Sequence, residues 1–164
     1  MELSGNRVLN VGFTQYGWLH AESGVEIKDQ GSYYTNVNAV YGGVYYLKDS
    51  FAEIQAIEVK NSLTQYGGVI YSVDSSRFTI KNSKFQNTQA SYSGGMILIL
   101  RSSLLRQVDT ITISDTEITD TYANSEGGTI YLENDGIDIS LMNVKVKNTS
   151  ARYASGGFIS ISKG

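Results

Sequence analysis

The apolar positions of this chain gather in short strands, and each of these strands follows a pair of glycines. Five copies of the pattern are present, and the second reads Gly67-Gly68-Val69-Ile70-Tyr71-Ser72. A degenerate copy begins at Gly17, and the glycine pairs after it begin at Gly42, Gly67, Gly94, Gly127 and Gly156. Successive intervals are 25, 25, 27, 33 and 29 residues. A repeat of roughly 20 to 50 residues is typical of a solenoid, in which each structural unit packs on the next.

Each repeat contains a second kind of strand, in which apolar and polar residues alternate. Alternation with a period of two predicts a strand with one buried face. We assign this strand to residues 57–61, 78–82, 111–115 and 139–143. A third, shorter strand follows at residues 85–88, 118–121 and 146–149, and Leu63 stands in a shortened version of it one repeat earlier. Helical spacing is absent, and so is proline, which removes a hydrogen bond from a sheet.

Three strands per repeat, stacked on their equivalents, predict an all-β right-handed parallel β-helix of about six coils. Residues 1–164 form a single segment of this solenoid. Neither end carries a helix or a charged cap, and exposed strand edges promote further pairing. We therefore expect both ends to be continued, by further sequence or by another copy stacked head to tail.

The glycine strand is apolar on both faces. We place Tyr45, Ile70, Ile97, Ile130 and Ile159 inward, with Leu47, Ser72, Ile99, Leu132 and Ile161. A sheet that is apolar on both faces is normally covered on both, so the outward residues are candidates for a lateral interaction surface. Two alternatives are a surface that simply suits strand residues, and a cover formed by the loop at residues 101–109 through Leu104 and Leu105. The candidate interaction face consists of Val44, Tyr46, Val69, Tyr71, Met96, Leu98, Thr129, Tyr131 and Phe158.

Asparagine and aspartate recur at two corners of the repeat. One corner carries Asn61, Asn82, Asp115 and Asn143, and the other carries Asn87, Asp120 and Asn148. Calcium prefers oxygen ligands of this kind, but each corner holds a single acid. We therefore predict side-chain ladders that close turns and no metal or cofactor, because Asx residues tolerate turn geometry and satisfy nearby backbone donors. Asn148-Thr149-Ser150 is also a glycosylation sequon, with Asn148 as the possible acceptor.

Charge and composition limit the classes of partner that the chain can bind. The chain has 13 basic and 16 acidic residues, a net charge of −3, and no cysteine. It lacks the basic surface of a nucleic-acid-binding protein and any apolar run long enough for a membrane span. His20, the only histidine, has no catalytic partners in the sequence, and we expect it at the edge of the first coil. The threonines form no regular array of the kind an ice-binding surface needs.

An enzyme of this architecture needs convergent carboxylates on one sheet face. Acidic residues are scarce among the positions that we place outward on the alternating strand, and we expect no enzymatic activity. Those positions are Glu58, Lys60, Thr79, Lys81, Thr112, Ser114, Ser140 and Met142.

The repeat motifs Gly127-Gly128-Thr129-Ile130-Tyr131 and Phe85-Gln86-Asn87 resemble the repeats of polymorphic outer-membrane, or autotransporter passenger, proteins. More broadly, the chain is similar to pectin-lyase-like β-helix proteins. The resemblance implies an extracellular or cell-surface location and a role in adhesion or as a scaffold. The predicted partner is another protein or a second copy. The alternative is a carbohydrate-active β-helix, a polysaccharide lyase or hydrolase, whose catalytic coils lie outside this chain.

Overall fold

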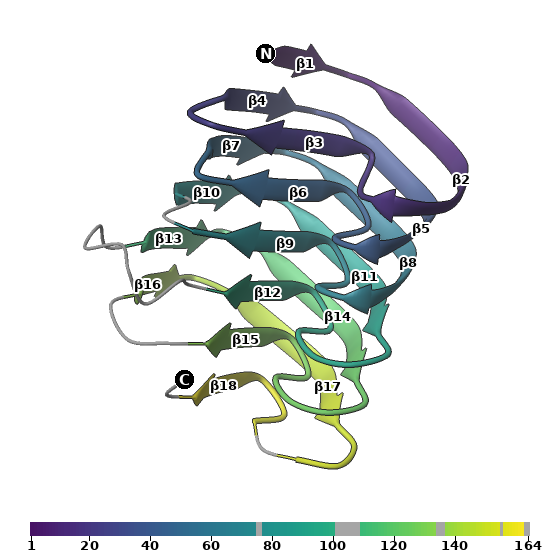
Figure 1. The fold of residues 1–164 in the computed structure, drawn as a ribbon, viewed down its shortest axis with the longest axis vertical. Coiled ribbons are helices and arrows are strands. Elements are labelled where there is room, and N and C mark those ends of the chain that lie inside the picture. The colour runs from purple at the N-terminus through teal and green to yellow at the C-terminus, as the bar shows by residue number, and fades with distance from the viewer. Residues whose placement is uncertain (75–76, 101–108, 134–136, 155, 163–164) are drawn as a thin grey trace.

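The computed structural model describes residues 1–74, 77–100, 109–133, 137–154 and 156–162, and these residues form eighteen strands and no helix. The strands make three parallel sheets of six strands each. Every coil contributes one strand to each sheet, so the chain is a parallel β-solenoid of six coils with its two termini at opposite ends of the stack (Figure 1). The predicted all-β architecture with three strands per coil is confirmed.

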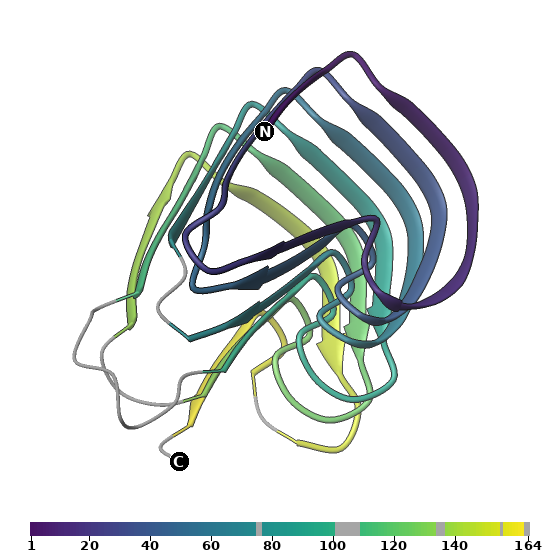
Figure 2. The same ribbon diagram turned by 45° about the horizontal axis from the view of Figure 1, so that its top comes forward.

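The three sheets are numbered here in the order in which a coil visits them. Sheet 1 contains β1 (Glu2–Ser4), β4 (Glu26–Gln30), β7 (Phe51–Gln55), β10 (Arg77–Lys81), β13 (Asp109–Ser114) and β16 (Ile137–Met142). Sheet 2 contains β2 (Arg7–Tyr16), β5 (Tyr33–Tyr41), β8 (Glu58–Tyr66), β11 (Lys84–Ala90), β14 (Glu117–Ala123) and β17 (Lys145–Ala151). Sheet 3 contains the glycine strands β3 (Leu19–Glu22), β6 (Tyr45–Lys48), β9 (Ile70–Val73), β12 (Ile97–Leu100), β15 (Ile130–Glu133) and β18 (Ile159–Ser162). Figure 2 shows the strands of each sheet lying side by side, coil after coil.

Apolar side chains that face the inside of the coils form the core, and residues in register stack along the solenoid axis. In sheet 1, Ile54 pairs with Ile80, and Ile80 pairs with Ile113. All three are at most 1% exposed and belong to one core cluster. The inward assignment in sheet 3 is confirmed from Tyr45 to Leu132, whereas Ile161 in the last coil is 68% exposed.

The register corrects one repeat of the sequence interpretation. Residues 57–61 do not continue the alternating strand of residues 78–82, because Glu58 pairs with Lys84 and Val59 pairs with Phe85 in sheet 2. The alternating strand of that coil is β7, in which Ala52 occupies the position of Phe78. Alanine contributes little to an apolar pattern, which is why this strand escaped the periodicity.

The glycine pairs lie in the corner between a strand of sheet 2 and the next strand of sheet 3, where the backbones of adjacent coils approach closely. Gly67 has a φ of +60°, a conformation that side chains other than glycine rarely adopt. The following glycine has no positive φ, but a Cβ on Gly68 would overlap the carbonyl oxygen of Gly95 in the next coil. The first glycine therefore allows the turn, and the second allows adjacent coils to stack at strand spacing.

Candidate functional site

The outward face of sheet 3 is not exposed, so the prediction of a free interaction surface there is wrong. Val44, Val69 and Met96 are fully buried in the inner core cluster, so their predicted outward facing is wrong. Thr129 is fully buried as well, and Phe158 packs partly buried against the same core. The outward row of Tyr46, Tyr71, Leu98 and Tyr131 is only 2–9% exposed. This row packs against Tyr16, Tyr41, Tyr66, Val73 and Leu100.

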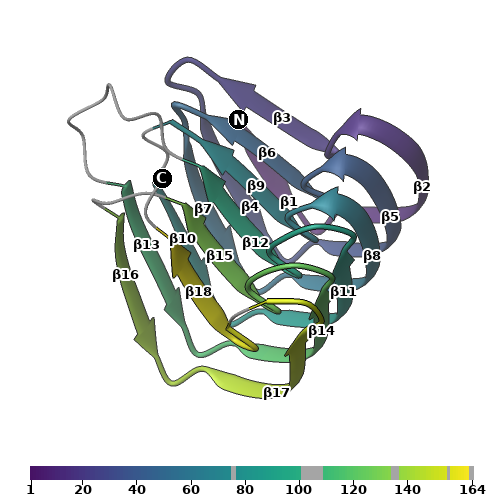
Figure 3. The ribbon, with the colours of Figure 1, turned by 60° about the horizontal axis from the view of Figure 1, so that its bottom comes forward.

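The cover comes from the chain itself. Between a strand of sheet 2 and the next strand of sheet 3 the backbone turns back in a tight curl (Figure 3). Tyr41 is the last residue of β5, where such a curl begins, and its ring contacts Tyr71 in the following coil with centroids 4.8 Å apart. Leu104 and Leu105, the alternative cover considered from the sequence, lie outside the described residues.

The curls carry a row of stacked rings, Tyr16, Tyr41, Tyr66 and Tyr92, which we call the tyrosine ladder. Ring centroids are 6.1 Å apart for Tyr16 and Tyr41, 5.4 Å for Tyr41 and Tyr66, and 4.7 Å for Tyr66 and Tyr92. The interplanar angle falls from 26° to 15° and then to 7° along this series. A one-coil offset between equivalent tyrosines thus produces nearly parallel stacking, which follows from the strand spacing of about 4.8 Å.

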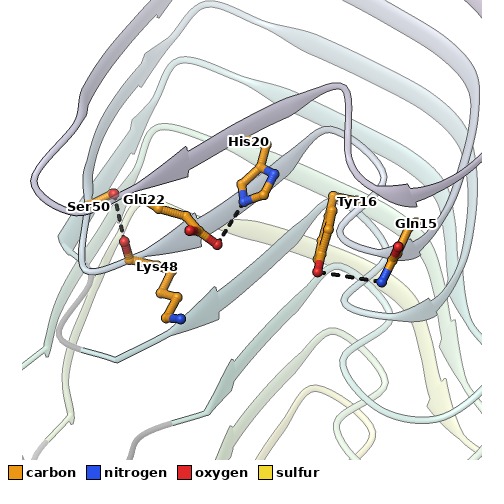
Figure 4. A network of polar contacts seen from close by, with 6 residues as sticks. All are labelled: Gln15, Tyr16, His20, Glu22, Lys48 and Ser50. Carbon is orange, nitrogen blue, oxygen red and sulfur yellow. Dashed lines mark hydrogen bonds and ion pairs between the residues drawn. The ribbon is translucent and has the colours of Figure 1, made fainter.

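His20 lies at the first coil, as the sequence predicted. Its ring centroid is 4.5 Å from that of Tyr16 and 4.7 Å from that of Tyr46. Its Nε2 lies 2.9 Å from Oε1 of Glu22, and the hydrogen bond lowers the pKa of that carboxyl group (Figure 4). Gln15 Nε2 donates to the Tyr16 hydroxyl at 3.5 Å. Polar contacts at the surface therefore surround the first-coil end of the tyrosine ladder.

Burial raises the pKa of several tyrosines on and beneath the ladder. Desolvation is the largest cause for Tyr46, Tyr66, Tyr71 and Tyr131, and neighbouring tyrosines raise the pKa of Tyr71 further. An ionised phenolate would have to lose hydration within a row of aromatic rings. These groups therefore hold their protons more tightly in the folded chain than in the unfolded chain.

We expect the fold to lose stability in alkaline solution. Unfolded tyrosine titrates near pH 10, and the folded pKa values of these tyrosines are higher, so their contribution is complete below about pH 10. It is lost as the pH rises from there through the folded pKa values. Thermal unfolding followed by circular dichroism at increasing pH, with tyrosinate absorbance recorded in parallel, tests this. A melting temperature that stays constant while the tyrosines ionise would contradict it.

A buried carboxylate lies inside the second coil. Asp29 is 1% exposed. Ser32 Oγ donates to its Oδ1 at 2.5 Å, and the hydroxyls of Tyr34 and Tyr45 donate to its Oδ2, each at 2.5 Å. Both tyrosines are fully buried, and desolvation, followed by the neighbouring cluster groups, raises the pKa of each.

Asp29 is not among the candidate residues that the sequence predicts. Its position in the repeat could have indicated that it is buried, because the residues in register with Asp29 in the two adjacent coils are the apolar Leu3 and Ile54. Within the described part of the chain, Asp29 is the one acidic or basic residue that is buried. An ionised carboxylate accepts hydrogen bonds only, so three converging hydroxyl donors compensate much of the cost of burying it.

The Asx ladders are real, but their membership differs from the prediction. Asn61 belongs with Asn87, Asp120 and Asn148, because its strand is in sheet 2. In this ladder Asn61 Nδ2 donates to Asn36 Oδ1 at 3.2 Å, Asn87 Nδ2 to Asn61 Oδ1 at 2.8 Å, and Asn148 Nδ2 to Asp120 Oδ1 at 2.9 Å. All these residues have positive φ, so they close turns as well as linking coils.

The second ladder is shorter. It contains Asn82, Asp115 and Asn143, and Asn143 Nδ2 donates to Asp115 Oδ1 at 2.8 Å. The equivalent turn of earlier coils is made by Gly5, Gly31 and Ala56, also with positive φ. No group of three or more histidine, cysteine or acidic side chains able to hold a metal occurs among the described residues. The Asn148 side chain is exposed, and its glycosylation stays a prediction.

The outward face of sheet 1 carries aromatic and charged side chains that the sequence interpretation did not place there. Phe51 is 37% exposed, and the Arg77 guanidinium lies 5.8 Å from its ring centroid. Lys28 Nζ lies 3.4 Å from Oε1 of Glu26, and the nearby carboxylates, Glu26 first, raise the pKa of Lys28. A shallow groove of about 360 Å³ crosses this face, lined by Glu26, Phe51, Ala52, Glu53, Arg77, Phe78, Thr79, Thr110 and Thr112.

This finding corrects the expectation that acid is scarce on that face. Glu58 and Lys60, which we had placed there, lie in sheet 2 and pair with each other at 2.6 Å. Glu26 and Glu53 occupy the outward face of sheet 1 instead. The shifted repeat at residues 51–61 caused the error, and a 26-residue offset from the strand at Arg77–Lys81 would have found Glu53.

Fold and surface together define a parallel β-solenoid repeat protein with aromatic and amide ladders along its axis. Comparisons with protein-family models, with curated proteins and with solved structures gave no match. Among the described residues, no helix has the length and hydrophobicity needed to cross a membrane.

Proposed function

We propose that the chain is a structural and adhesive scaffold that contacts a protein partner through the outward face of sheet 1. The observation that carries this proposal is the exposed Phe51–Arg77 pair, which lines the groove. Aromatic and arginine side chains are enriched among the residues that dominate binding energy at protein interfaces. The resemblance to outer-membrane passenger repeats supports an extracellular or cell-surface location.

The other two sheets offer less to a partner. Sheet 3 is covered by the tyrosine ladder and the residues around it. Sheet 2 carries an outward row in which Glu58, Lys84, Glu117 and Lys145 follow one another in register. Opposite charges alternate from coil to coil along this row, an arrangement that favours coil stacking. On sheet 1, Arg77 instead follows Phe51 and precedes Thr110.

The proposal is tested with the purified chain against itself and against arrays of extracellular matrix proteins. A second copy is the first partner to examine, by sedimentation over a concentration series. The double variant Phe51→Ser/Arg77→Glu should bind at least about 2 kcal/mol more weakly, roughly a 30-fold change in Kd. Both side chains lie on the surface side of the sheet, so circular dichroism should be unchanged.

The matched control is Leu63→Ser/Arg152→Glu. Leu63 is 51% exposed on sheet 2, and Arg152 is exposed beyond the end of β17. This variant makes the same kinds of change away from the groove and should bind as the wild type does. If both double variants bind equally well, sheet 1 is not the contact surface.

A second function, action on a carbohydrate, is favoured by one observation. Glu53 pairs with Lys28, two residues along from Glu26. Strand geometry places the two glutamate Cα atoms about 8 Å apart. Carboxyl groups that extend outward in parallel from these positions would have a similar separation, within the range of about 6.5–9.5 Å found in inverting glycosidases. Incubation with a panel of polysaccharides tests this, with Glu26→Gln/Glu53→Gln as the comparison. Release of sugar by the wild type alone would replace the scaffold proposal with an enzyme.

A further inference from the structure

We propose that Tyr66 and Tyr92 form an oxidative cross-linking site. At this site a one-electron oxidant, of the class formed by a haem peroxidase with hydrogen peroxide, joins two neighbouring coils through a dityrosine bond. The inference is independent of the proposed scaffold function, because it rests on the tyrosine ladder and not on sheet 1.

The two rings are already arranged as a pair. Their centroids are 4.7 Å apart and their planes differ by 7°, the closest and most parallel tyrosine pair of the ladder. Tyr92 is 51% exposed, so an oxidant can reach it, while Tyr66 lies partly buried beneath it. A radical formed at Tyr92 therefore meets a second phenol before it meets another molecule.

The backbone holds this pair in place. Tyr92 N donates to Gln65 O at 2.9 Å, and Ser91 N donates to Thr64 O at 2.9 Å. Gly67 N donates in turn to Ser93 O at 3.1 Å. Hydrogen bonds between the two curls on both sides of the rings thus fix the relative position of the two backbones. The rings start within one ring distance of each other and must rotate out of the stack to form the bond, which lies in the plane of both rings.

The reaction balances without a group from the protein. Each phenol loses one electron and its hydroxyl proton to give a tyrosyl radical, whose unpaired electron is shared with the ring carbons ortho to the oxygen. The two radicals form one carbon–carbon bond between ortho carbons. The hydrogens on those carbons move to the phenolic oxygens and restore aromaticity. Two electrons and two protons leave in total, and they reduce one hydrogen peroxide to two water molecules.

Other tyrosines meet the two requirements less well. The other pairs of the ladder stack at 6.1 and 5.4 Å, and each of their rings is only partly exposed. Tyr46 and Tyr71 are stacked at 5.5 Å, but they are 9% and 8% exposed. Tyr153 is 73% exposed, but its ring lies against the Arg152 guanidinium. Stacking and access coincide at Tyr66 and Tyr92. The bond would tie adjacent coils together and restrict the unfolded chain, as a disulfide does.

The experiment treats the dilute, full-length chain with a haem peroxidase and hydrogen peroxide. We expect dityrosine fluorescence, a loss of two hydrogen atoms in the mass of the monomer, and a cross-linked peptide pair containing Tyr66 and Tyr92. The yield per molecule should not depend on protein concentration, and the melting temperature should rise.

Two variants of the tyrosine ladder and one control variant test the proposal. Tyr92→Phe keeps the stacked ring but removes the phenol, and nearly all the intramolecular product should disappear. Tyr66→Phe should have the same effect, which covers the case in which one variant folds poorly. Tyr153→Phe removes the most exposed tyrosine and should leave the yield unchanged. A product that is intermolecular, that contains Tyr153, or that persists in both ladder variants would overturn the proposal.

Discussion

Ile80→Asp is expected to unfold the whole solenoid. Ile80 is fully buried at the centre of the stack from Ile54 to Ile113. The substitution removes about 1.5–3 kcal/mol of burial and places an unpaired carboxylate in the core, which costs several kcal/mol more. No coil is stable alone, because ordering each residue costs about 1–2 kcal/mol of backbone entropy and only packing on both neighbouring coils offsets it.

Circular dichroism and urea unfolding measure this effect, and a loss of more than about 4 kcal/mol is expected. Gln55→Asp is the control, because it adds the same charge at an exposed position of the neighbouring strand, in register with Lys81. It should change the free energy of unfolding by no more than about 0.5 kcal/mol. An Ile80→Asp chain with unchanged melting would mean that Ile80 does not face the core.

The double variant Tyr34→Phe/Tyr45→Phe is expected to lose about 3–5 kcal/mol of stability. Both phenol hydroxyls donate to the buried Asp29 carboxylate, and hydrogen bonds to a charged group contribute about 1.5–3 kcal/mol each. The phenylalanines fill the same space, so the loss comes from a carboxylate left with Ser32 as its remaining side-chain donor. Urea unfolding at neutral pH measures the change.

Adding Asp29→Leu to this double variant should restore most of the loss. The apolar side chain then stacks between Leu3 and Ile54, and replacing a buried polar group together with its partners is often nearly neutral or stabilising. Asp29→Leu alone should be worse than the triple variant, because it leaves two buried hydroxyls without their acceptor. A triple variant no more stable than the double variant would show that the tyrosine hydroxyls do not act through Asp29.

The pattern of residues along the chain was sufficient for the architecture. A glycine pair that recurs every 25 to 33 residues, and strands that alternate with a period of two, leave a parallel stack of coils as the arrangement that buries every apolar face. The Asx turns followed for the same reason, since Asn82 and Asn148 adopt the positive φ that few other side chains tolerate. These are local properties of the sequence, and they recur in every repeat.

Only the tertiary structure determines which residues cover each face of a sheet. An apolar outward row such as Tyr46 and Tyr71 looks the same in sequence whether a partner or the chain itself covers it. The tyrosines that cover it, Tyr41 and Tyr66, stand immediately before the next glycine pair, outside the strands that the periodicity predicts. Their position outside sheet 3 depends on the curl of the backbone between two sheets, which no local periodicity encodes.

The same limit explains Asp29 and the groove on sheet 1. A single acid in an alternating strand reads as polar, and only the packed coils bring Ser32, Tyr34 and Tyr45 to its oxygens. Ala52 weakened the pattern of one strand, so Phe51 and Glu53 were assigned to no face until pairing with Arg77 and Thr79 set the register. Periodicity determines which strands exist, whereas register between coils, a long-range property, determines which side chains meet.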